Sequence, residues 1–173
     1  MKYATVLLIS LIFYSFQNPL IKEKPNKVTE VYIFLEEDCR ISQFYTNTLN
    51  DLHQQFANEH ITFTGVFPSQ TTKQKDISEF KKKYGIPFNL IFDNQQVLTK
   101  KFGATITPEV VVYQPDEKKV IYKGRIDNSY FRVGKRRNVV TTNELKHVLN
   151  CVKNNSAIKI SWKEAIGCYI KII

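Results

Sequence analysis

One cysteine of this chain, Cys39, stands where an apolar stretch ends and a segment with helical spacing begins. Residues 31–35 read Val-Tyr-Ile-Phe-Leu, which is typical of a buried strand, and the acidic residues 36–38 form the turn between strand and helix. A thiol at the start of a helix lies beside unpaired backbone N–H groups and the positive end of the helix dipole, and both favour the thiolate. We therefore interpret Cys39 as a candidate nucleophile towards a disulfide or a peroxide, or as a metal ligand.

The neighbours of Cys39 act on its charge in opposite directions. Arg40 favours the thiolate, whereas the carboxylates of residues 36–38 oppose it. The alternative is that Cys39 only packs, because free cysteine is often buried. Ser42, one helical turn further on, either donates a hydrogen bond to the thiolate or serves only as a first-turn residue.

The other two cysteines, Cys151 and Cys168, leave the total odd and too small for a disulfide-stapled scaffold. Cys151 lies at the margin of an apolar helical stripe, where we expect a packing residue. Cys168 lies in a tail after the last helix, and we interpret it as a resolving thiol for Cys39 or as a structural disulfide partner. Both interpretations require the tail to fold back over the sheet. The three histidines show no metal-ligand spacing, so we expect no metal and no cofactor.

The two ends of the chain differ from its middle in composition. We predict a signal or membrane-tether segment over residues 1–17, a linker over 18–27, one domain over 28–154, and a tail over 155–173 that packs on the domain. The apolar block at residues 4–16 has a basic start and a poor cleavage site, so an uncleaved tether is the alternative to a removed signal. We therefore expect the protein in the periplasm or otherwise exported, where disulfides persist.

The net charge of +9 is mostly spread along the chain, except for a basic segment between Lys118 and Arg137. We interpret this basic segment as a solvated face, with an anionic partner or membrane headgroups as the alternatives. Predicted export argues against a nucleic-acid partner, and we expect none.

Apolar periodicity predicts an alternating order of strands and helices. The expected strands are 31–35, 60–66, 88–92, 109–113 and 119–123, and the expected helices are 41–56, 69–84, 94–102 and one from Leu145 after a capping box at 141–144. Residues 127–140 are expected to be an ordered loop. Alternation followed by a hairpin and a last helix predicts an α/β fold with a mixed sheet and helices on both faces.

The position of Cys39, the order of elements and the sequence Thr-Ile-Thr-Pro-Glu-Val-Val-Val at 105–112 resemble the thioredoxin-like fold. The resemblance implies that Pro108 is a cis-proline opposite Cys39. It also implies that the backbone at Thr107 and Pro108 pairs with an extended substrate peptide, with Ser42 close by.

Three further segments are similar to the redoxin branch, the alkyl-hydroperoxide-reductase and thiol-specific-antioxidant relatives of exported bacterial proteins. They are Asp-Cys-Arg-Ile-Ser at 38–42, the Tyr-Lys-Gly-Arg-Ile-Asp segment at 122–127 with the basic run 134–137, and Gly-Cys-Tyr-Ile at 167–170. The match covers residues 28–173.

Two departures from these families weaken the prediction of a thioredoxin-type reductase and that of a peroxiredoxin. Ser42 stands where a thioredoxin-type reductase has its second cysteine, and Tyr32 and Glu36 stand where a peroxiredoxin has Pro and Thr. We predict a thiol-disulfide oxidoreductase or antioxidant-type protein that uses Cys39, with a protein thiol or disulfide or a small oxidant as substrate and an external reductant. A non-catalytic protein that binds or assembles a partner is one alternative, and a peroxiredoxin-like peroxidase is another. The prediction depends on a reachable Cys39 at the mouth of a groove beside Pro108.

Overall fold

The computed structural model describes residues 27–173, so the predicted signal or tether segment lies outside the described residues. In the described part, no helix combines the length and the apolar character needed to cross a membrane. The elements in chain order are β1 (Thr29–Phe34), α1 (Arg40–Phe56), β2 (Ile61–Phe67), α2 (Gln74–Tyr84), β3 (Asn89–Phe92), α3 (Val97–Phe102), β4 (Ile106–Thr107), β5 (Glu109–Gln114), β6 (Lys119–Gly124), β7 (Tyr130–Arg132), β8 (Lys135–Arg136), α4 (Glu144–Lys153) and β9 (Cys168–Tyr169).

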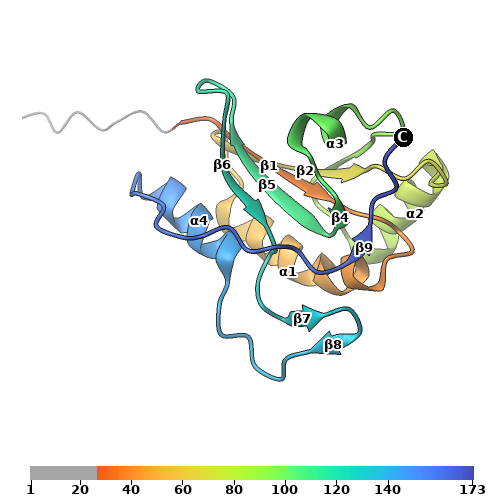
Figure 1. Cartoon of the computed structure of the whole chain (residues 1–173). Helices are drawn as coiled ribbons and strands as arrows, with labels where there is room; N and C mark the ends of the chain where they lie inside the picture. Colours follow the sequence, from red (N-terminus) through yellow and green to blue (C-terminus); the bar gives the residue numbers. More distant parts are fainter. Residues whose placement is uncertain (1–26) are drawn as a thin grey trace, which may run out of the picture.

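The centre of the protein is a five-stranded mixed sheet in the order β3-β2-β1-β5-β6 (Figure 1). The first three strands run parallel, whereas β5 is antiparallel to both β1 and β6. The central strand β1 buries one face fully, and on its other face Glu30 and Tyr32 are half-buried and Phe34 is buried, which explains the apolar residues at its carboxyl end. The predicted mixed sheet is confirmed.

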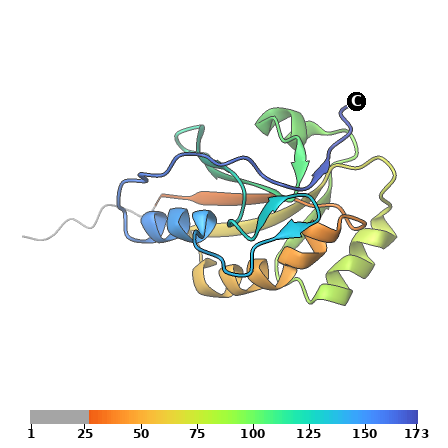
Figure 2. The same ribbon diagram turned by 60° about the horizontal axis from the view of Figure 1, so that its bottom comes forward.

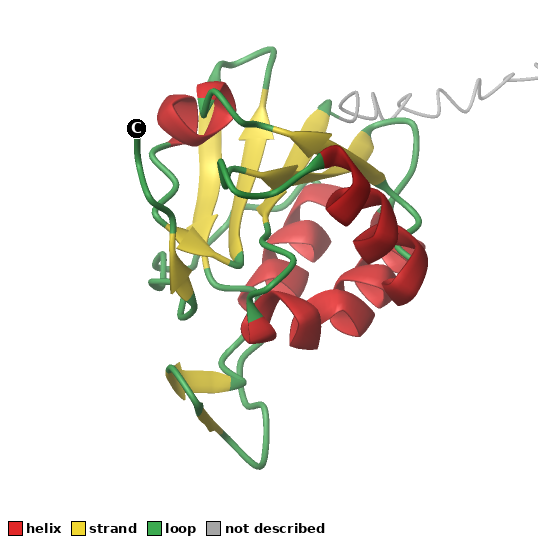
Figure 3. Cartoon of the chain, turned by 90° about the vertical axis from the view of Figure 1, so that its right-hand side faces the viewer, coloured by secondary structure: helices red, strands yellow, loops and turns green. Residues whose placement is uncertain are grey.

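Helices cover both faces of the sheet. Helices α1, α2 and α4 lie on one face and α3 lies on the other (Figure 3). The larger core cluster joins the sheet to the three helices of the first face and contains buried residues such as Leu49, Phe80 and Leu149. The smaller cluster, which includes Phe34 and Phe102, lies under α3. This arrangement holds β1, and therefore the start of α1, rigidly at the middle of the protein.

Helix α2 begins five residues later than the periodicity predicts. The Ser69 hydroxyl pairs with the Thr71 hydroxyl, and the Thr72 hydroxyl donates to Glu37. Serine and threonine side chains that bond locally compete with helical hydrogen bonding, so the segment 69–73 forms a loop. The helix begins where the backbone N–H of Lys73 donates to the carboxylate of Asp76.

The predicted capping box at 141–144 is wrong, because α4 begins at Glu144 with Asn143 as its N-cap. The Glu144 carboxylate accepts hydrogen bonds from the Arg125 guanidinium and the Thr142 hydroxyl instead. This buried ion pair ties the segment after β6 to the start of α4.

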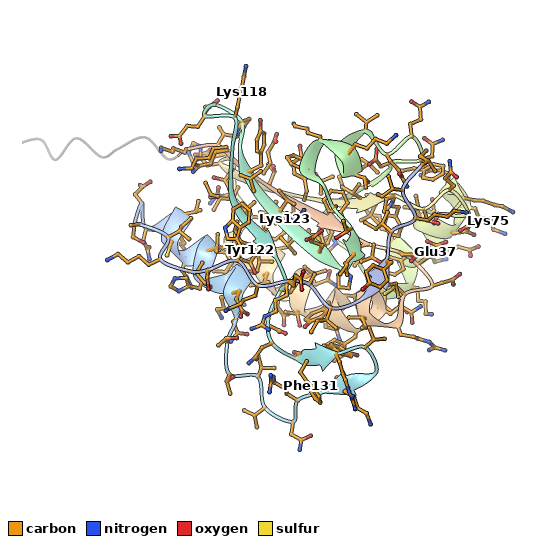
Figure 4. The ribbon with its side chains drawn as sticks, viewed as in Figure 1. Glu37, Lys75, Lys118, Tyr122, Lys123 and Phe131 are labelled. Carbon is orange, nitrogen blue, oxygen red and sulfur yellow. The ribbon has the colours of Figure 1, made fainter. Side chains whose placement is uncertain are left out.

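The segment 127–140, expected to be a loop, contains the two-stranded hairpin β7–β8. The hairpin projects away from the sheet, and Phe131 lies on it (Figure 4). The apolar periodicity missed these strands because they have only three and two residues.

The tail after α4 returns along the domain and ends with β9 beside β4 (Figures 1 and 2). It passes the end of β6, where the backbone N–H of Arg125 donates to the carbonyl of Lys163. The Trp162 side chain is 53% exposed, whereas Ala165 and Gly167 are buried.

Candidate functional site

The thiol of Cys39 lies at the N-terminus of α1, as the sequence predicts. Cys39 is the N-cap residue, and its carbonyl accepts the first helical hydrogen bond, from the N–H of Gln43. Just before the helix, the acidic turn closes with a hydrogen bond from the Cys39 N–H to the Glu36 carbonyl. The thiol is therefore fixed between the end of the central strand and the first turn of the helix.

The segment Thr107–Pro108 lies directly against this thiol. The Thr107–Pro108 peptide bond is cis. The Cys39 Sγ lies 3.2 Å from the carbonyl oxygen of Thr107, and the protonated thiol donates to it. The sequence places these residues 68 positions apart, and the pairing of β1 with β5 brings them together.

The second thiol of the site comes from the tail. Strand β9 pairs antiparallel with β4, with Cys168 opposite Thr107. Both cysteines are free, and the Cys168 side chain lies close enough to Cys39 to lower the pKa of its thiol. The tail therefore folds back over the sheet and brings the two cysteines together beside Thr107, as both interpretations of Cys168 require.

The contact pushes the pKa values of the two thiols apart. Burial raises the pKa of Cys39, but the hydrogen bonds from Cys168 and from the backbone and hydroxyl of Ser42 outweigh it, so the pKa of Cys39 lies below its ordinary value. Burial and the nearby Cys39 sulfur raise the pKa of Cys168 to about 12. One proton is thus held on Cys168 while Cys39 ionises.

Ser42 is fully buried and contacts the site on two sides. Its hydroxyl lowers the pKa of Cys39 and accepts a hydrogen bond of 3.4 Å from the Glu36 N–H. These contacts are compatible with both interpretations of Ser42, as a donor to the thiolate and as a first-turn residue.

The acidic turn before Cys39 is directed partly away from the sulfur. The Glu37 carboxylate accepts a hydrogen bond of 2.7 Å from the Thr72 hydroxyl. Burial raises the pKa of Glu36, which keeps its carboxyl closer to neutral, and its charge contributes to the high pKa of Cys168. The predicted opposition of the acidic turn to a Cys39 thiolate is therefore weakened by these contacts.

The expectation of a reachable Cys39 is wrong for this arrangement. Only 2% of Cys39 is exposed, because the Cys168 strand covers the sulfur. A cavity of about 200 Å³ lies beside the pair, lined among others by Glu36, Thr107 and Tyr169, but Cys39 is not part of its lining. Cys39 can meet a substrate only after the tail moves.

Gly167 and Gln96 hold the tail in place, and the sequence analysis singled out only Gly167, as part of the segment 167–170. A Cβ at Gly167 would overlap the carbonyl oxygen of Thr107, so only glycine permits this approach. The fully buried Gln96 accepts from the N–H of Ile173 through its side-chain oxygen and donates to the carbonyl of Lys171. Nothing in the local sequence around Gln96 indicates this role, whereas the Gly-Cys pair at 167–168 was recognisable as part of a redoxin-like segment.

Cys151 and the histidines lie outside the site. Cys151 is 7% exposed, as expected of a packing residue, and its sulfur is 3.6 Å from Nε2 of His147 on the preceding turn of α4. His53 is half-buried against the rings of Phe63 and Phe88, rather than solvent-exposed as the polar side of a helix suggests. Among the described residues, no three His, Cys, Asp or Glu side chains gather as a metal site.

Comparison with known proteins identifies the family and agrees with the fold. The sequence profile of the AhpC/TSA family matches residues 21–140, a span that contains Cys39 and Pro108 but not the Cys168 tail. No curated protein sequence matches the chain.

Solved structures show the same fold at low sequence identity. A hypothetical protein from Sinorhizobium meliloti is 20% identical, with a TM-score of 0.72, over 84% of this chain and 80% of its own. An uncharacterized conserved protein from Geobacillus kaustophilus is 21% identical, with a TM-score of 0.73, over 85% of this chain and 78% of its own. The thioredoxin domain of a thiol-disulfide oxidoreductase from Bacteroides vulgatus is 15% identical, with a TM-score of 0.52, over 76% of this chain and 81% of its own.

Proposed function

Because this chain belongs to the AhpC/TSA family, whose profile covers Cys39 and Pro108, we propose that it is a thiol-disulfide oxidoreductase that reacts through Cys39 and Cys168. The observation that carries the proposal is the contact between the two sulfurs opposite Thr107, with their pKa values displaced in opposite directions. Titratable neighbours with separated pKa values mark distinct chemical roles.

The pKa order assigns those roles. Cys39, with the lowered pKa, is the thiolate that attacks first, and Cys168 keeps its proton. Once Cys39 is bonded to a substrate sulfur, its negative charge is gone, and with it one of the causes that raise the pKa of Cys168. When the tail returns to β4, Cys168 becomes the second thiolate beside the sulfur that it must attack.

The reaction balances as two thiol-disulfide exchanges. The Cys39 thiolate attacks one sulfur of a substrate disulfide, forms a mixed disulfide and releases the other sulfur as a thiolate. The released thiolate takes up the proton of Cys168. The Cys168 thiolate then attacks Cys39 Sγ and releases the second substrate sulfur as a thiolate, which takes up a proton from water. The substrate gains two electrons, the protein keeps a Cys39–Cys168 disulfide, and an external dithiol reduces it again.

The substrate in this proposal is a protein disulfide, because the backbone beside Pro108 offers an edge to an extended peptide. The name of the Bacteroides vulgatus structure, a thiol-disulfide oxidoreductase, is consistent with such a substrate but describes that protein. Export to the periplasm or another oxidising compartment belongs to the proposal and rests on residues 1–17 of the sequence. A tether through residues 4–16 is its alternative.

The burial of Cys39 favours one rival, a non-catalytic protein in which the covered thiol only packs. Peroxidase chemistry has weaker support, because Tyr32 hydrogen-bonds Glu30 rather than a peroxide pocket, and Glu36 occupies the position of the peroxidase threonine. Trapping of a sulfenic acid on Cys39 after peroxide treatment would favour it.

Reduction of a model protein disulfide tests the proposal. Cys39→Ser should abolish the activity while changing the free energy of unfolding by no more than about 1 kcal/mol, because the serine hydroxyl can still donate to Thr107. Cys168→Ser should stop the cycle at a mixed disulfide on Cys39, which intact-mass spectrometry detects. Cys151→Ala is the matched control and should retain activity. Full activity in Cys39→Ser contradicts the proposal.

A further inference from the structure

The edge of β4 next to Pro108 is already occupied by the chain itself. The β9 backbone pairs with β4, with Ile106 opposite Tyr169 and Thr107 opposite Cys168. The ladder continues with a hydrogen bond of 2.9 Å from the Ile170 N–H to the Thr105 carbonyl. The tail thus lies where an extended substrate segment must lie to bring its sulfur to Cys39.

At residue 167 there is no room for a side chain, which restricts the segment that can occupy this edge. Residue 167 must be glycine, because any side chain there would meet the Thr107 carbonyl oxygen. The following residue, Cys168, then has its sulfur against Cys39. The next side chain, that of Tyr169, is 85% exposed, so the site does not select the residue at this position by burial.

The occupant is held by short-range pairing and by attachments on either side of it. The paired strand is only two residues long, and the Thr107 hydroxyl donates a hydrogen bond of 3.5 Å to the Cys168 carbonyl. On one side is the Arg125–Lys163 backbone bond, on the other are the Ile170–Thr105 bond and the Gln96 clamp on residues 171 and 173. Ile166 and Ile170 also pack against the core. The tail pairs with β4 and not with a strand of the five-stranded sheet, so it can leave while that sheet stays intact.

We propose that the β4 edge is a binding site for an extended polypeptide segment with glycine directly before cysteine, and that residues 166–170 are its resident ligand. This inference rests on the proposed function for the identity of the partner, a protein that carries such a segment as the substrate cysteine. The resident tail competes at the high effective concentration of a tethered ligand. A partner therefore binds in proportion to the fraction of protein whose tail has left the edge.

Two variants free the tail in different ways. Gly167→Ala introduces the side chain that overlaps the Thr107 carbonyl oxygen. Ile170→Pro removes the N–H that donates to the Thr105 carbonyl. Gly134→Ala in the exposed hairpin turn is the matched control: no atom lies within 4 Å of the added Cβ, and the strain that its φ of +72° causes is confined to the turn, away from the β4 edge. Circular dichroism and thermal unfolding identify which variants keep the fold.

The probe is a fluorescent peptide with the sequence of residues 163–171 in which the cysteine is replaced by serine, so that its binding needs no redox step. Its anisotropy should report binding to the freed variants at least about ten-fold tighter than to the wild type and to Gly134→Ala. A second peptide, with alanine in place of the glycine, should lose at least about ten-fold in affinity. Alkylation of Cys39 at a pH above the ordinary thiol pKa should be about ten-fold faster or more in the freed variants. Peptide mass spectrometry measures its rate.

The outcomes separate the inference from the proposed function. If a freed variant is folded and its Cys39 is alkylated rapidly, yet neither peptide binds, the binding site does not exist. If Cys39 is not alkylated faster, the tail is not what covers the edge, and the inference also fails. If the freed variants form dimers by exchanging tails, the occupant of the edge is a second copy of this chain, and the proposed partner protein is wrong. Because the probe lacks sulfur, it should also bind a freed variant that carries Cys39→Ser, whatever the outcome of the activity assay.

Discussion

At the scale of single residues, the chemistry depends on one proton shared by two sulfurs. A buried thiolate would be costly on its own, and the Thr107 carbonyl oxygen, 3.2 Å away, disfavours it further. The donors that offset this cost are the Cys168 thiol and the Ser42 hydroxyl and backbone. The pKa of Cys39 therefore rises when the tail withdraws its donor, which couples the charge of Cys39 to the position of β9.

Removal of one donor should show this balance. Ser42→Ala eliminates the hydroxyl and should raise the pKa of Cys39, because burial continues to oppose the thiolate with one fewer hydrogen bond against it. The thiolate fraction at neutral pH should therefore fall. The measurement is the ultraviolet absorbance of the thiolate against pH, with Cys39→Ser as the blank. An unchanged titration midpoint would mean that the Ser42 hydroxyl only packs.

At the scale of elements, the ion pair between the segment after β6 and the start of α4 is a separate determinant of stability. Glu144 is 3% exposed, and burial alone would raise its pKa, but the Arg125 and Thr142 hydrogen bonds hold it below the usual range. Its folded pKa lies below the unfolded one. Its contribution to stability is therefore present above the unfolded pKa and is lost as the pH falls through the folded pKa.

Arg125→Met should leave the Glu144 carboxylate buried without its cation and lower the free energy of unfolding by about 3 kcal/mol near neutral pH. In the variant, only the Thr142 hydroxyl and the Glu144 backbone N–H remain to oppose the effect of burial on the pKa of Glu144, so that pKa should rise, and the penalty should shrink as the pH falls and the carboxyl takes up a proton. Urea unfolding across pH measures both effects. The double variant with Glu144→Gln should recover part of the loss at neutral pH. A penalty that does not depend on pH would show that the guanidinium only packs.

The predictability of the elements follows from their length. The five strands of the central sheet and all four helices were predictable, because each carries an apolar run or stripe long enough to show its period. The short strands β7, β8 and β9 have two or three residues, which is too few for any period. From the sequence, the proximity of Cys39 and Cys168 could be stated only conditionally: it requires the tail to fold back over the sheet. The burial of Cys39 could not be predicted, because it depends on the clamp by Gln96 across 75 or more residues.

At the scale of the whole molecule, a bond between Cys39 and Cys168 would join the start of the first helix to the last strand. The loop that it closes has about 130 residues, and a cross-link of that span restricts the unfolded chain by roughly 5 kcal/mol in the chain-entropy account. The native chain already holds the two sulfurs in contact, so bond formation demands little rearrangement. The oxidised protein should therefore be more stable than the reduced one.

Guanidinium unfolding of the oxidised and the reduced protein tests this expectation, with Cys151→Ala used in both states so that only one pairing can form. The oxidised form should have a distinctly higher midpoint, and Cys168→Ser treated with the same oxidant should show no increase. By the thermodynamic cycle, each kcal/mol gained on oxidation makes the disulfide equally harder to reduce in the folded protein than in the unfolded chain. A reductant able to complete the proposed cycle must overcome that difference. An oxidised form that is no more stable than the reduced one would mean that the disulfide displaces β9 from β4, and the resident tail and the resolving thiol could not then be the same docked segment.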